Sequence, residues 1–325
     1  MRALVWHGPG RISVDELPEP EAGAGEVLLV PEAAGICGSD VEGYSGAQGN
    51  RTPPLVMGHE LAGRVVAVGE GVEAEWQGRR TAVNPLVPGD DARPGIEQLS
   101  RRRELIGVHR PGGFAGAVRV PASQLRELPA EVDARLGALA EPLANGVHAN
   151  RIGRLGGAES VGVLELHDGR RRAARELGAS ATFSSADELR SATIGGSETF
   201  GEAEAPRSAA GDGFDLVFDA VGAEATRRLA IELLRPGGCA VMIGLATDAT
   251  PVGFHAVVRG GLTIRGSYAY TADDYDAALA LLVEGRAGLG ELEAVRPLEA
   301  GPEAFAQLAA RPSPRLKVFL AAEPA

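Results

Sequence analysis

The chain has 325 residues, enough for two domains, and its 44% hydrophobic and 23% charged residues are typical of a folded globular protein. A net charge of −12 argues against a nucleic-acid partner, since the most basic stretch, Ser100–Arg110, is short enough to be a solvated face. No apolar run reaches the ~20 residues of a membrane span and the first ten residues lack a secretory core, so we expect a cytoplasmic protein without a membrane partner.

The first third of the sequence predicts a barrel-like β domain. Short β-type runs alternate with turn signals such as "GPG" and "GEG"; the runs are "RALVW", "EVLLVPEAAGI", "ELAGRVVAVG", "RTAVNPLV" and "GAVRVPASQL". The tail "GPEAFAQLAARPSPRLKVFL" predicts a helix and a last strand, which we expect to fold back onto this first domain.

From about Leu136 the pattern changes to α/β. A helical segment, "RLGALAEPLANGVHANRIG", precedes strand–helix pairs: "SVGVLEL" with "GRRRAARELGA", "DLVFDAVG" with "AEATRRLAIELL", and then "GCAVMIGL". Such alternation predicts a parallel sheet with helices on both faces. The polar segment Ser184–Gly213 predicts one surface helix and a mobile loop. The fold class is therefore α/β, with one domain formed by residues 1–145 and 295–325 and a second by residues 146–294.

Four side chains suggest a metal site. Cys37 lies in "GICGSD", His59 and Glu60 lie in "GHE", and Glu141 lies in "AEPLA". Thiolate, imidazole and carboxylate are zinc ligands, and three of them plus a water form the catalytic pattern. A thiolate and one carboxylate balance Zn²⁺, which lowers the pKa of a bound hydroxyl and stabilises an alkoxide. Each residue alone is more often structural, but the combination is more specific than its parts.

These motifs, followed by "FDLVFDAVG" and "LRPGGCAVMIGL", resemble those of the zinc-dependent medium-chain dehydrogenases, most closely the sorbitol and 2,3-butanediol dehydrogenase branch. The resemblance implies a GroES-like β-barrel catalytic domain, a Rossmann-type cofactor domain and a homo-oligomer, either dimer or tetramer. It implies that Cys37, His59 and Glu60 bind zinc and that Glu141 holds the zinc water or exchanges with it as a ligand. Ser39 would receive the substrate hydroxyl proton, with Asp40 as support behind the ligands.

Two departures from the family pattern concern the metal site and the proton path. The segment from Asn84 to Gly107 carries no cysteine, so the four-cysteine structural site of the family cannot form and one zinc per chain is the maximum. Where the family commonly has a histidine three residues after the serine, this chain has Glu42. Glu42 serves as a proton relay only if its pKa is raised; otherwise it is a solvated side chain.

A third departure truncates the cofactor domain. "RIGRLGGAESVGVLEL" passes from the "EPLA" helix almost directly to the family's second strand, so the first strand, its Gly-x-Gly-x-x-Gly turn and its helix, roughly 20–25 residues, are missing. Neither "GRLGG", which precedes a strand, nor the one glycine of "HDGRRR" suits a phosphate loop. Because the first strand is normally central, we expect the remaining strands to close ranks, that is, to pair directly with one another, or a partner chain to help stabilise the sheet. We also expect weakened dinucleotide affinity.

Other cofactor residues follow from the resemblance. Glu165 takes the position that binds the adenosine ribose, which favours NAD over NADP, and Arg170 lies on the adenine side. Later strand ends would border the cofactor at Gly222, Gly244, Leu245 and Ser267. Glycines at strand ends also have a purely structural explanation.

Three functions remain open. The first is a zinc- and NAD-dependent dehydrogenase of a small alcohol, polyol or sugar-like substrate, with an impaired or rearranged cofactor site. The second is a non-redox zinc enzyme, such as a lyase, isomerase or hydrolase, which the missing glycine turn favours. The third is a catalytically idle binding subunit, against which the complete set of Cys37, His59, Glu60 and Glu141 argues.

Overall fold

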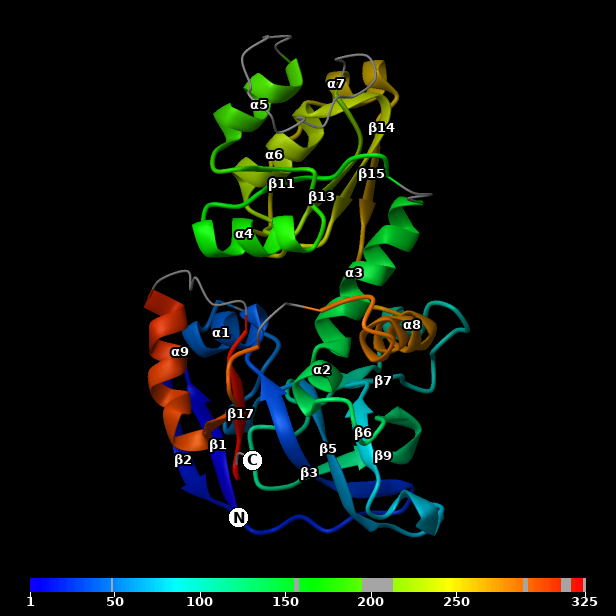
Figure 1. Cartoon of the computed structure of the whole chain (residues 1–325), viewed down its shortest axis with the longest axis vertical. Coiled ribbons are helices and arrows are strands. Elements are labelled where there is room, and N and C mark those ends of the chain that lie inside the picture. The colour runs from blue at the N-terminus through cyan, green and yellow to red at the C-terminus, as the bar shows by residue number, and fades with distance from the viewer. Residues whose placement is uncertain (48, 155–157, 195–212, 289–291, 311–316, 324–325) are drawn as a thin grey trace. The chain divides into compact units, whose positions relative to one another are not determined.

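The structure, a computed structural model, describes all residues except 48, 155–157, 195–212, 289–291, 311–316 and 324–325. The chain divides into two compact units (Figure 1). The first contains Met1–Ala144 and Tyr270–Ala325, and the second contains Asn145–Ala269. None of the described helices is long and apolar enough to cross a membrane.

One domain boundary differs from the sequence prediction. The sequence predicts a return to the first domain at residue 295, whereas the structure places it at Tyr270. The reason is helix α8 (Ala272–Val283), which packs against α2 (Ala134–Ala138) and buries one apolar side, namely Tyr275, Ala278, Leu279 and Leu282. Residues 270–294 therefore belong to the first unit and not, as predicted, to the second.

The first unit is built on antiparallel sheets, as its β-type runs predict. The longer sheet has the order β10-β6-β5-β3-β17-β16, with β9 also paired to β3; the strands are β3 (Glu26–Gly35), β5 (Glu60–Val68), β6 (Arg80–Val83), β9 (Val118–Pro121), β10 (Leu125–Glu127), β16 (Arg296–Pro297) and β17 (Phe319–Ala321). The smaller sheet has the order β2-β1-β4, formed by β1 (Arg2–Gly8), β2 (Arg11–Glu16) and β4 (Leu55–Val56). Their inner faces share one apolar core that includes Leu4, Leu29, Leu61, Phe114 and Leu320.

Strand β3 ends between two other strands of the longer sheet. Its last residue, Gly35, pairs antiparallel with Glu60 of β5 on one side and with Phe319 of β17 on the other. The C-terminal strand thus returns to the first domain as predicted, preceded by α9 (Gly301–Ala310), which packs against α1 (Gly38–Ser45). The ends of three strands, distant in sequence, meet where α1 begins.

The cysteine-free segment forms an ordered loop around Asp91. Its elements are β7 (Leu86–Val87), the 3₁₀ turn Glu97–Leu99 and β8 (Glu104–Leu105), which pairs with β7. Asp91 accepts hydrogen bonds from the Ser100 hydroxyl and from the backbone N–H of Arg101, at 2.9 Å, and of Arg102, at 3.3 Å. Ser100 Oγ in turn accepts from the N–H of Gly89. A single carboxylate therefore ties together both arms of this loop.

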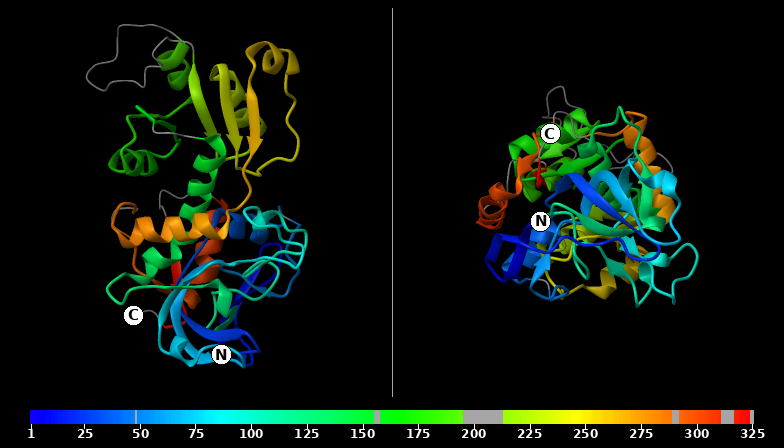
Figure 2. Two further views of the ribbon diagram at one scale, coloured as in Figure 1. Left: turned by 90° about the vertical axis from the view of Figure 1, so that its right-hand side faces the viewer. Right: turned by 90° about the horizontal axis from the view of Figure 1, so that it is seen from below.

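The second unit contains the predicted strand–helix alternation. After α3 (Ala140–Gly153) come β11 (Gly162–Leu164), α4 (Asp168–Glu176), β12 (Ala181–Phe183), α5 (Ala186–Ile194), β13 (Phe214–Asp219), α6 (Glu224–Glu232), β14 (Leu234–Met242), α7 (Phe254–Gly260) and β15 (Thr263–Gly266). All strand pairs here are parallel, and Figure 2 shows β13, β14 and β15 side by side. The surface helix predicted in Ser184–Gly213 is α5, whereas the predicted mobile loop at 195–212 lies outside the described residues.

In the part of the chain that the structure describes, the sheet of the second unit is split, so its strands do not close ranks; the alternative, help from a partner chain, stays a prediction. Among the described residues, β11 pairs with β12, and β13 pairs with β14 and β14 with β15, but no ladder joins the two groups. Side chains bridge them instead: Phe183 of β12 and Leu189 of α5 pack with Leu229 and Leu233 from the α6 region. This apolar cluster is a contact between the two groups of strands.

Helix α3 covers part of β13. A Cβ at Gly153 would lie 2.9 Å from a methyl of Leu216, so a larger residue would push this side chain aside, and Arg265 of β15 donates to the Ile152 carbonyl at 3.0 Å. Only residues 154–161 separate α3 from β11. Eight residues are too few for a strand, a glycine turn and a helix, which supports the predicted truncation.

Asp91→Asn should loosen the loop. The hydrogen bonds from Ser100 and from the Arg101 amide lower the pKa of Asp91 from 3.8 to about 2. We expect Asp91→Asn to raise hydrogen exchange of the Arg101 and Arg102 amides several-fold at neutral pH. Asp90→Asn, which loses only the contact to the exposed Arg102 guanidinium, should leave that exchange unchanged.

In the wild-type protein, hydrogen exchange of the Arg101 and Arg102 amides should show the matching pH dependence. Because the folded-state pKa of Asp91 is depressed, the stabilisation of the loop by its ionised carboxylate is complete above pH 3.8. This stabilisation is lost as the pH falls toward about 2. Equal amide exchange in Asp91→Asn, Asp90→Asn and wild type would show that Asp91 does not organise the loop.

Candidate active site

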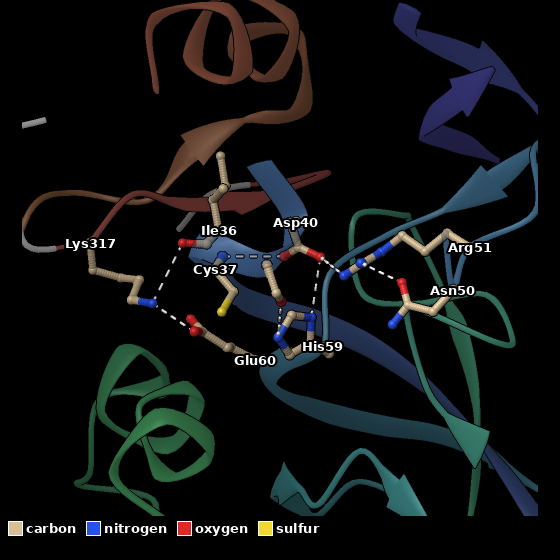
Figure 3. A network of polar contacts seen from close by, with 9 residues as sticks. Ile36, Cys37, Asp40, Asn50, Arg51, His59, Glu60 and Lys317 are labelled. Carbon is tan, nitrogen blue, oxygen red and sulfur yellow. Dashed lines mark hydrogen bonds and ion pairs between the residues drawn. The ribbon is translucent and has the colours of Figure 1, made fainter. Parts of the chain in front are cut away.

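Three potential metal ligands converge at the strand ends around Gly35. The Cys37 sulfur, a ring nitrogen of His59 and a carboxylate oxygen of Glu60 all lie within 4.8 Å of one another (Figure 3). Cys37 immediately precedes α1, and His59 immediately precedes β5, whose first residue is Glu60. The structure thus brings together three of the four residues that the sequence predicts as ligands.

Gly35 makes room for the Glu60 carboxylate. A Cβ at this position would lie 2.2 Å from Glu60 Oε2, far inside van der Waals contact. The first glycine of "GICGSD" is therefore required by the close approach of a charged side chain from the neighbouring strand, and not by its own backbone conformation.

Asp40 orients His59. Its Oδ1 lies 3.2 Å from His59 Nδ1 and 3.1 Å from Arg51 Nη2, while its Oδ2 accepts from the Cys37 backbone N–H at 3.2 Å (Figure 3). All of these groups except the Cys37 amide are nearly or fully buried. An imidazole that donates Nδ1–H to a carboxylate keeps the Nε2 lone pair for a metal. Asp40 therefore lies behind the candidate ligand His59, where the resemblance implies a supporting residue.

The same contacts set the charges of these groups. Burial disfavours the Asp40 carboxylate, but His59 and Arg51 outweigh it and lower the pKa of Asp40. Burial also disfavours the charged imidazole, yet the Asp40 and Cys37 charges raise the pKa of His59 well above its usual value. A raised pKa makes protons stronger competitors for His59, so we expect a metal to bind more weakly as the pH falls.

The two oxygens of Glu60 have different surroundings. Oε1 accepts a hydrogen bond from Lys317 Nζ at 2.6 Å, whereas Oε2 is buried without a hydrogen-bond partner among the described residues (Figure 3). A buried carboxylate oxygen without a partner is costly, and a cation next to it removes that cost. The donor set of a thiolate, an imidazole and a carboxylate fits a Zn²⁺ ion.

Glu141 lies outside this three-residue set. It is buried at the start of α3, and its carboxylate accepts a hydrogen bond from the Tyr270 hydroxyl. Burial raises the pKa of Glu141, and the charge of Glu60 adds to that effect. Its ligand or water-holding role stays a prediction.

Ser39 and Glu42 both lie on α1. Ser39 Oγ is 3.5 Å from His59 Nε2, so the predicted proton acceptor lies beside a predicted ligand. Glu42 follows three residues later, half-buried on the same side of the helix. The structure does not test whether Glu42 carries a proton.

Comparison with known proteins agrees with this geometry. Residues 23–130 match the alcohol dehydrogenase GroES-like domain, and residues 146–284 match the zinc-binding dehydrogenase domain. The chain is 32% identical to sorbitol dehydrogenase of Macaca fascicularis, over 93% of this chain and 91% of that protein. It is 30% identical to 2-dehydro-3-deoxy-L-galactonate 5-dehydrogenase of Pseudoalteromonas atlantica, over 89% of each. The chain belongs to the zinc-dependent medium-chain dehydrogenases.

Solved structures support the same assignment. A Sinorhizobium meliloti protein described as a zinc-binding dehydrogenase and bound to NADP has a TM-score of 0.86 and 28% identity, over 98% of each chain. Alcohol dehydrogenase from Thermus sp. ATN1 has a TM-score of 0.83 and 27% identity, over 99% of each chain. As a medium-chain dehydrogenase, the protein is an oxidoreductase with a GroES-like and a Rossmann-type domain, and the family uses zinc and a nicotinamide cofactor.

The predicted ribose-binding residue lies at a strand end of the second unit. Glu165 follows β11, and its Oε1 accepts from the His167 backbone N–H at 2.9 Å just before α4. Its Oε2 lies 3.6 Å from Arg170 Nη1. Glu165 and Arg170 are thus neighbours at the carboxyl end of a parallel strand, where dinucleotide-binding folds hold their ligand.

The remaining predicted cofactor residues lie at the ends of β13, β14 and β15. Gly222 has φ +76°, and a Cβ there would lie 2.0 Å from the Gly244 carbonyl oxygen. This backbone contact is a structural reason for both glycines. Leu245 is 65% exposed, and Ser267 is buried, its N–H donating to the Met242 carbonyl at 2.9 Å. Their cofactor role stays a prediction.

Sequence reasoning missed Arg51, Tyr270 and Lys317, which hold Asp40, Glu141 and Glu60, respectively. Arg51 and Tyr270 carry no distinctive local motif. Lys317 had a signal, because it is the only lysine in the whole sequence.

Gly35→Ala should weaken metal binding. The added methyl collides with Glu60 Oε2, and we expect a loss of about 10–100-fold in zinc affinity, the range typical for groups that place a metal ligand. Gly38→Ala in the same motif is the control, because its Cβ meets nothing within 4 Å. Zinc affinity is measured by competition with a chromophoric chelator. Wild-type affinity in Gly35→Ala would argue against Glu60 as a ligand.

Proposed function

We propose that this protein is a zinc- and NAD-dependent dehydrogenase that oxidises a secondary alcohol of a small polyol or diol to the ketone. The observation that carries the proposal is the convergence of Cys37, His59 and Glu60, with one buried Glu60 oxygen that has no hydrogen-bond partner among the residues that the structure describes. This arrangement supports a three-ligand catalytic zinc site with an open position.

The relatives support the substrate class. Sorbitol dehydrogenase and (R,R)-butanediol dehydrogenase of Bacillus subtilis, which is 28% identical over 88% of this chain, are named for neutral compounds with several hydroxyl groups. The non-redox zinc enzyme and the idle subunit have no comparable support. A dimer or tetramer remains a prediction.

Each site residue has a role in this proposal. Cys37, His59 and Glu60 hold the zinc, and Asp40 keeps His59 Nε2 directed to it. A bound Zn²⁺ supplies Lewis-acid polarisation of the substrate hydroxyl. Ser39 would accept the hydroxyl proton and give up its own toward Glu42 on the same helix, and a bound nicotinamide cofactor would supply the hydride acceptor.

The second unit supplies the cofactor in this proposal. Glu165 binds the ribose hydroxyls and repels the 2′-phosphate of NADP, hence the preference for NAD. With only residues 154–161 between α3 and β11, no glycine turn binds the pyrophosphate there, so we expect weak NAD affinity. The cysteine-free loop, organised by Asp91, leaves one zinc per chain.

Cys37→Ser should remove the metal and the activity together. The serine hydroxyl is a poor zinc ligand compared with a thiolate, so we expect zinc content near zero and loss of NAD-dependent alcohol oxidation. Cys239→Ser is the matched control, because the other cysteine lies in β14 of the second unit and should leave one zinc per chain. Elemental analysis and an NADH absorbance assay with sorbitol and 2,3-butanediol are the measurements.

Two outcomes would count against the proposal. One is wild-type protein that binds no zinc after metal reconstitution. The other is an NADH fluorescence titration without saturable binding at millimolar cofactor.

Glu165→Ala should shift cofactor preference. Removal of the carboxylate ends its repulsion of a 2′-phosphate, so the ratio of kcat/KM for NADP to that for NAD should rise several-fold. Glu159→Ala is the control, since Glu159 is exposed before β11. An unchanged ratio in Glu165→Ala would show that Glu165 does not contact the ribose.

A further inference from the structure

Of the 32 lysine and arginine residues in the sequence, Lys317 is the only lysine. It lies two residues before Phe319, which pairs with Gly35, and its side chain is only 12% exposed. Its ammonium contacts Glu60 Oε1 at 2.6 Å and the Ile36 carbonyl at 3.5 Å (Figure 3). The one lysine of this chain is therefore buried against a predicted zinc ligand.

The surroundings suit an ammonium group better than a guanidinium. A Cβ at Gly35 would be 3.2 Å from Lys317 Cδ, so the stem runs through a narrow space beside β3. Lysine ends in a compact point charge, whereas arginine ends in a wide planar fork. The chain uses arginine for its many surface ion pairs, such as Arg64–Glu32 and Arg79–Glu127, and lysine at this single buried position.

We propose that Lys317 is a positioning residue of the zinc site, which holds Glu60 Oε1 so that only Oε2 can bind the metal. This inference rests on the proposed function, because it requires zinc at Cys37, His59 and Glu60. With Oε1 occupied, Glu60 binds through one oxygen, and the fourth ligand position stays open for the substrate hydroxyl.

The charge of Lys317 has a second effect. The Cys37 thiolate and the Glu60 carboxylate together cancel Zn²⁺, and the Lys317 ammonium adds a positive charge that the nearby buried Glu141 shares. A positive charge there favours the negative oxygen that forms when an alcohol loses its proton. Without Lys317, Oε1 of the fully buried Glu60 has lost the cation that neutralises it. We then expect Glu60 to bind the metal through both carboxylate oxygens.

The first test compares Co²⁺-loaded wild type, Lys317→Met and Lys317→Arg, because cobalt spectra report coordination geometry. We expect four-coordinate d–d bands in wild type, weaker five-coordinate bands in Lys317→Met, and partial recovery in Lys317→Arg, whose wider guanidinium still offers N–H donors to Oε1. Activity with zinc should fall about 10–100-fold in Lys317→Met. Arg93→Met, which removes an exposed charge from the same unit, is the control and should match wild type.

The second test needs no variant of Lys317. Protein labelled with [ζ-¹⁵N]lysine contains one labelled ammonium, so its resonance reports Lys317 alone. We expect this signal to shift strongly when Co²⁺ replaces Zn²⁺. Substitution Glu60→Gln should change the signal in the zinc-loaded protein.

The outcomes separate this inference from the proposed function. If wild type binds neither Zn²⁺ nor Co²⁺, the proposed function itself fails. If wild type binds the metal but Lys317→Met keeps the wild-type cobalt spectrum, or Lys317→Arg is folded and matches Lys317→Met, the positioning role is wrong. A lysine signal that is insensitive to Co²⁺ would also overturn it.

Discussion

The candidate site depends on the pairing of β3 with β5 and β17 around one glycine. Gly35 lies opposite Glu60 and opposite Phe319, and this register brings Cys37, His59 and Lys317 to the same place as sequence neighbours of the paired residues. A slip of one residue in either ladder would turn the affected side chains to the other face of the sheet. The candidate metal ligands are therefore positioned by main-chain register, and the absent side chain of Gly35 leaves room for the Glu60 carboxylate.

The charges around these ligands are arranged in pairs before any metal binds. Asp40 is next to Arg51 and His59, and Glu60 is next to Lys317. Buried ion pairs contribute little net stability, but removal of one partner leaves a costly uncompensated charge. The Asp40 and Glu60 carboxylates therefore each have a cation beside them before any metal is added. Such a site suits a metal that serves catalysis more than folding.

The sequence predicted what depends on local pattern and failed where tertiary contacts decide. The β-type runs, the strand–helix alternation and the Cys37, His59 and Glu60 set were recognisable from spacing and residue type. The return of the chain at Tyr270 was not, because α8 owes its place to packing against α2. Lys317 was missed for a similar reason, since only the β3–β17 register brings it to Glu60. A residue type that occurs once in a chain is a signal that pattern reasoning did not use.

The described strands of the second unit form two separate parallel groups within one α/β unit. Each half is a parallel ladder with its own helices, and the apolar cluster around Phe183 and Leu229 joins them through side chains. Side-chain packing specifies the spacing of two strands less strictly than a hydrogen-bonded ladder does. Glu165 follows one half and Gly244 the other, so a dinucleotide bound by both must fix that spacing itself. The entropy lost when the dinucleotide fixes the spacing of the two groups of strands then opposes binding. This is a second reason, besides the missing glycine turn, to expect weak cofactor affinity.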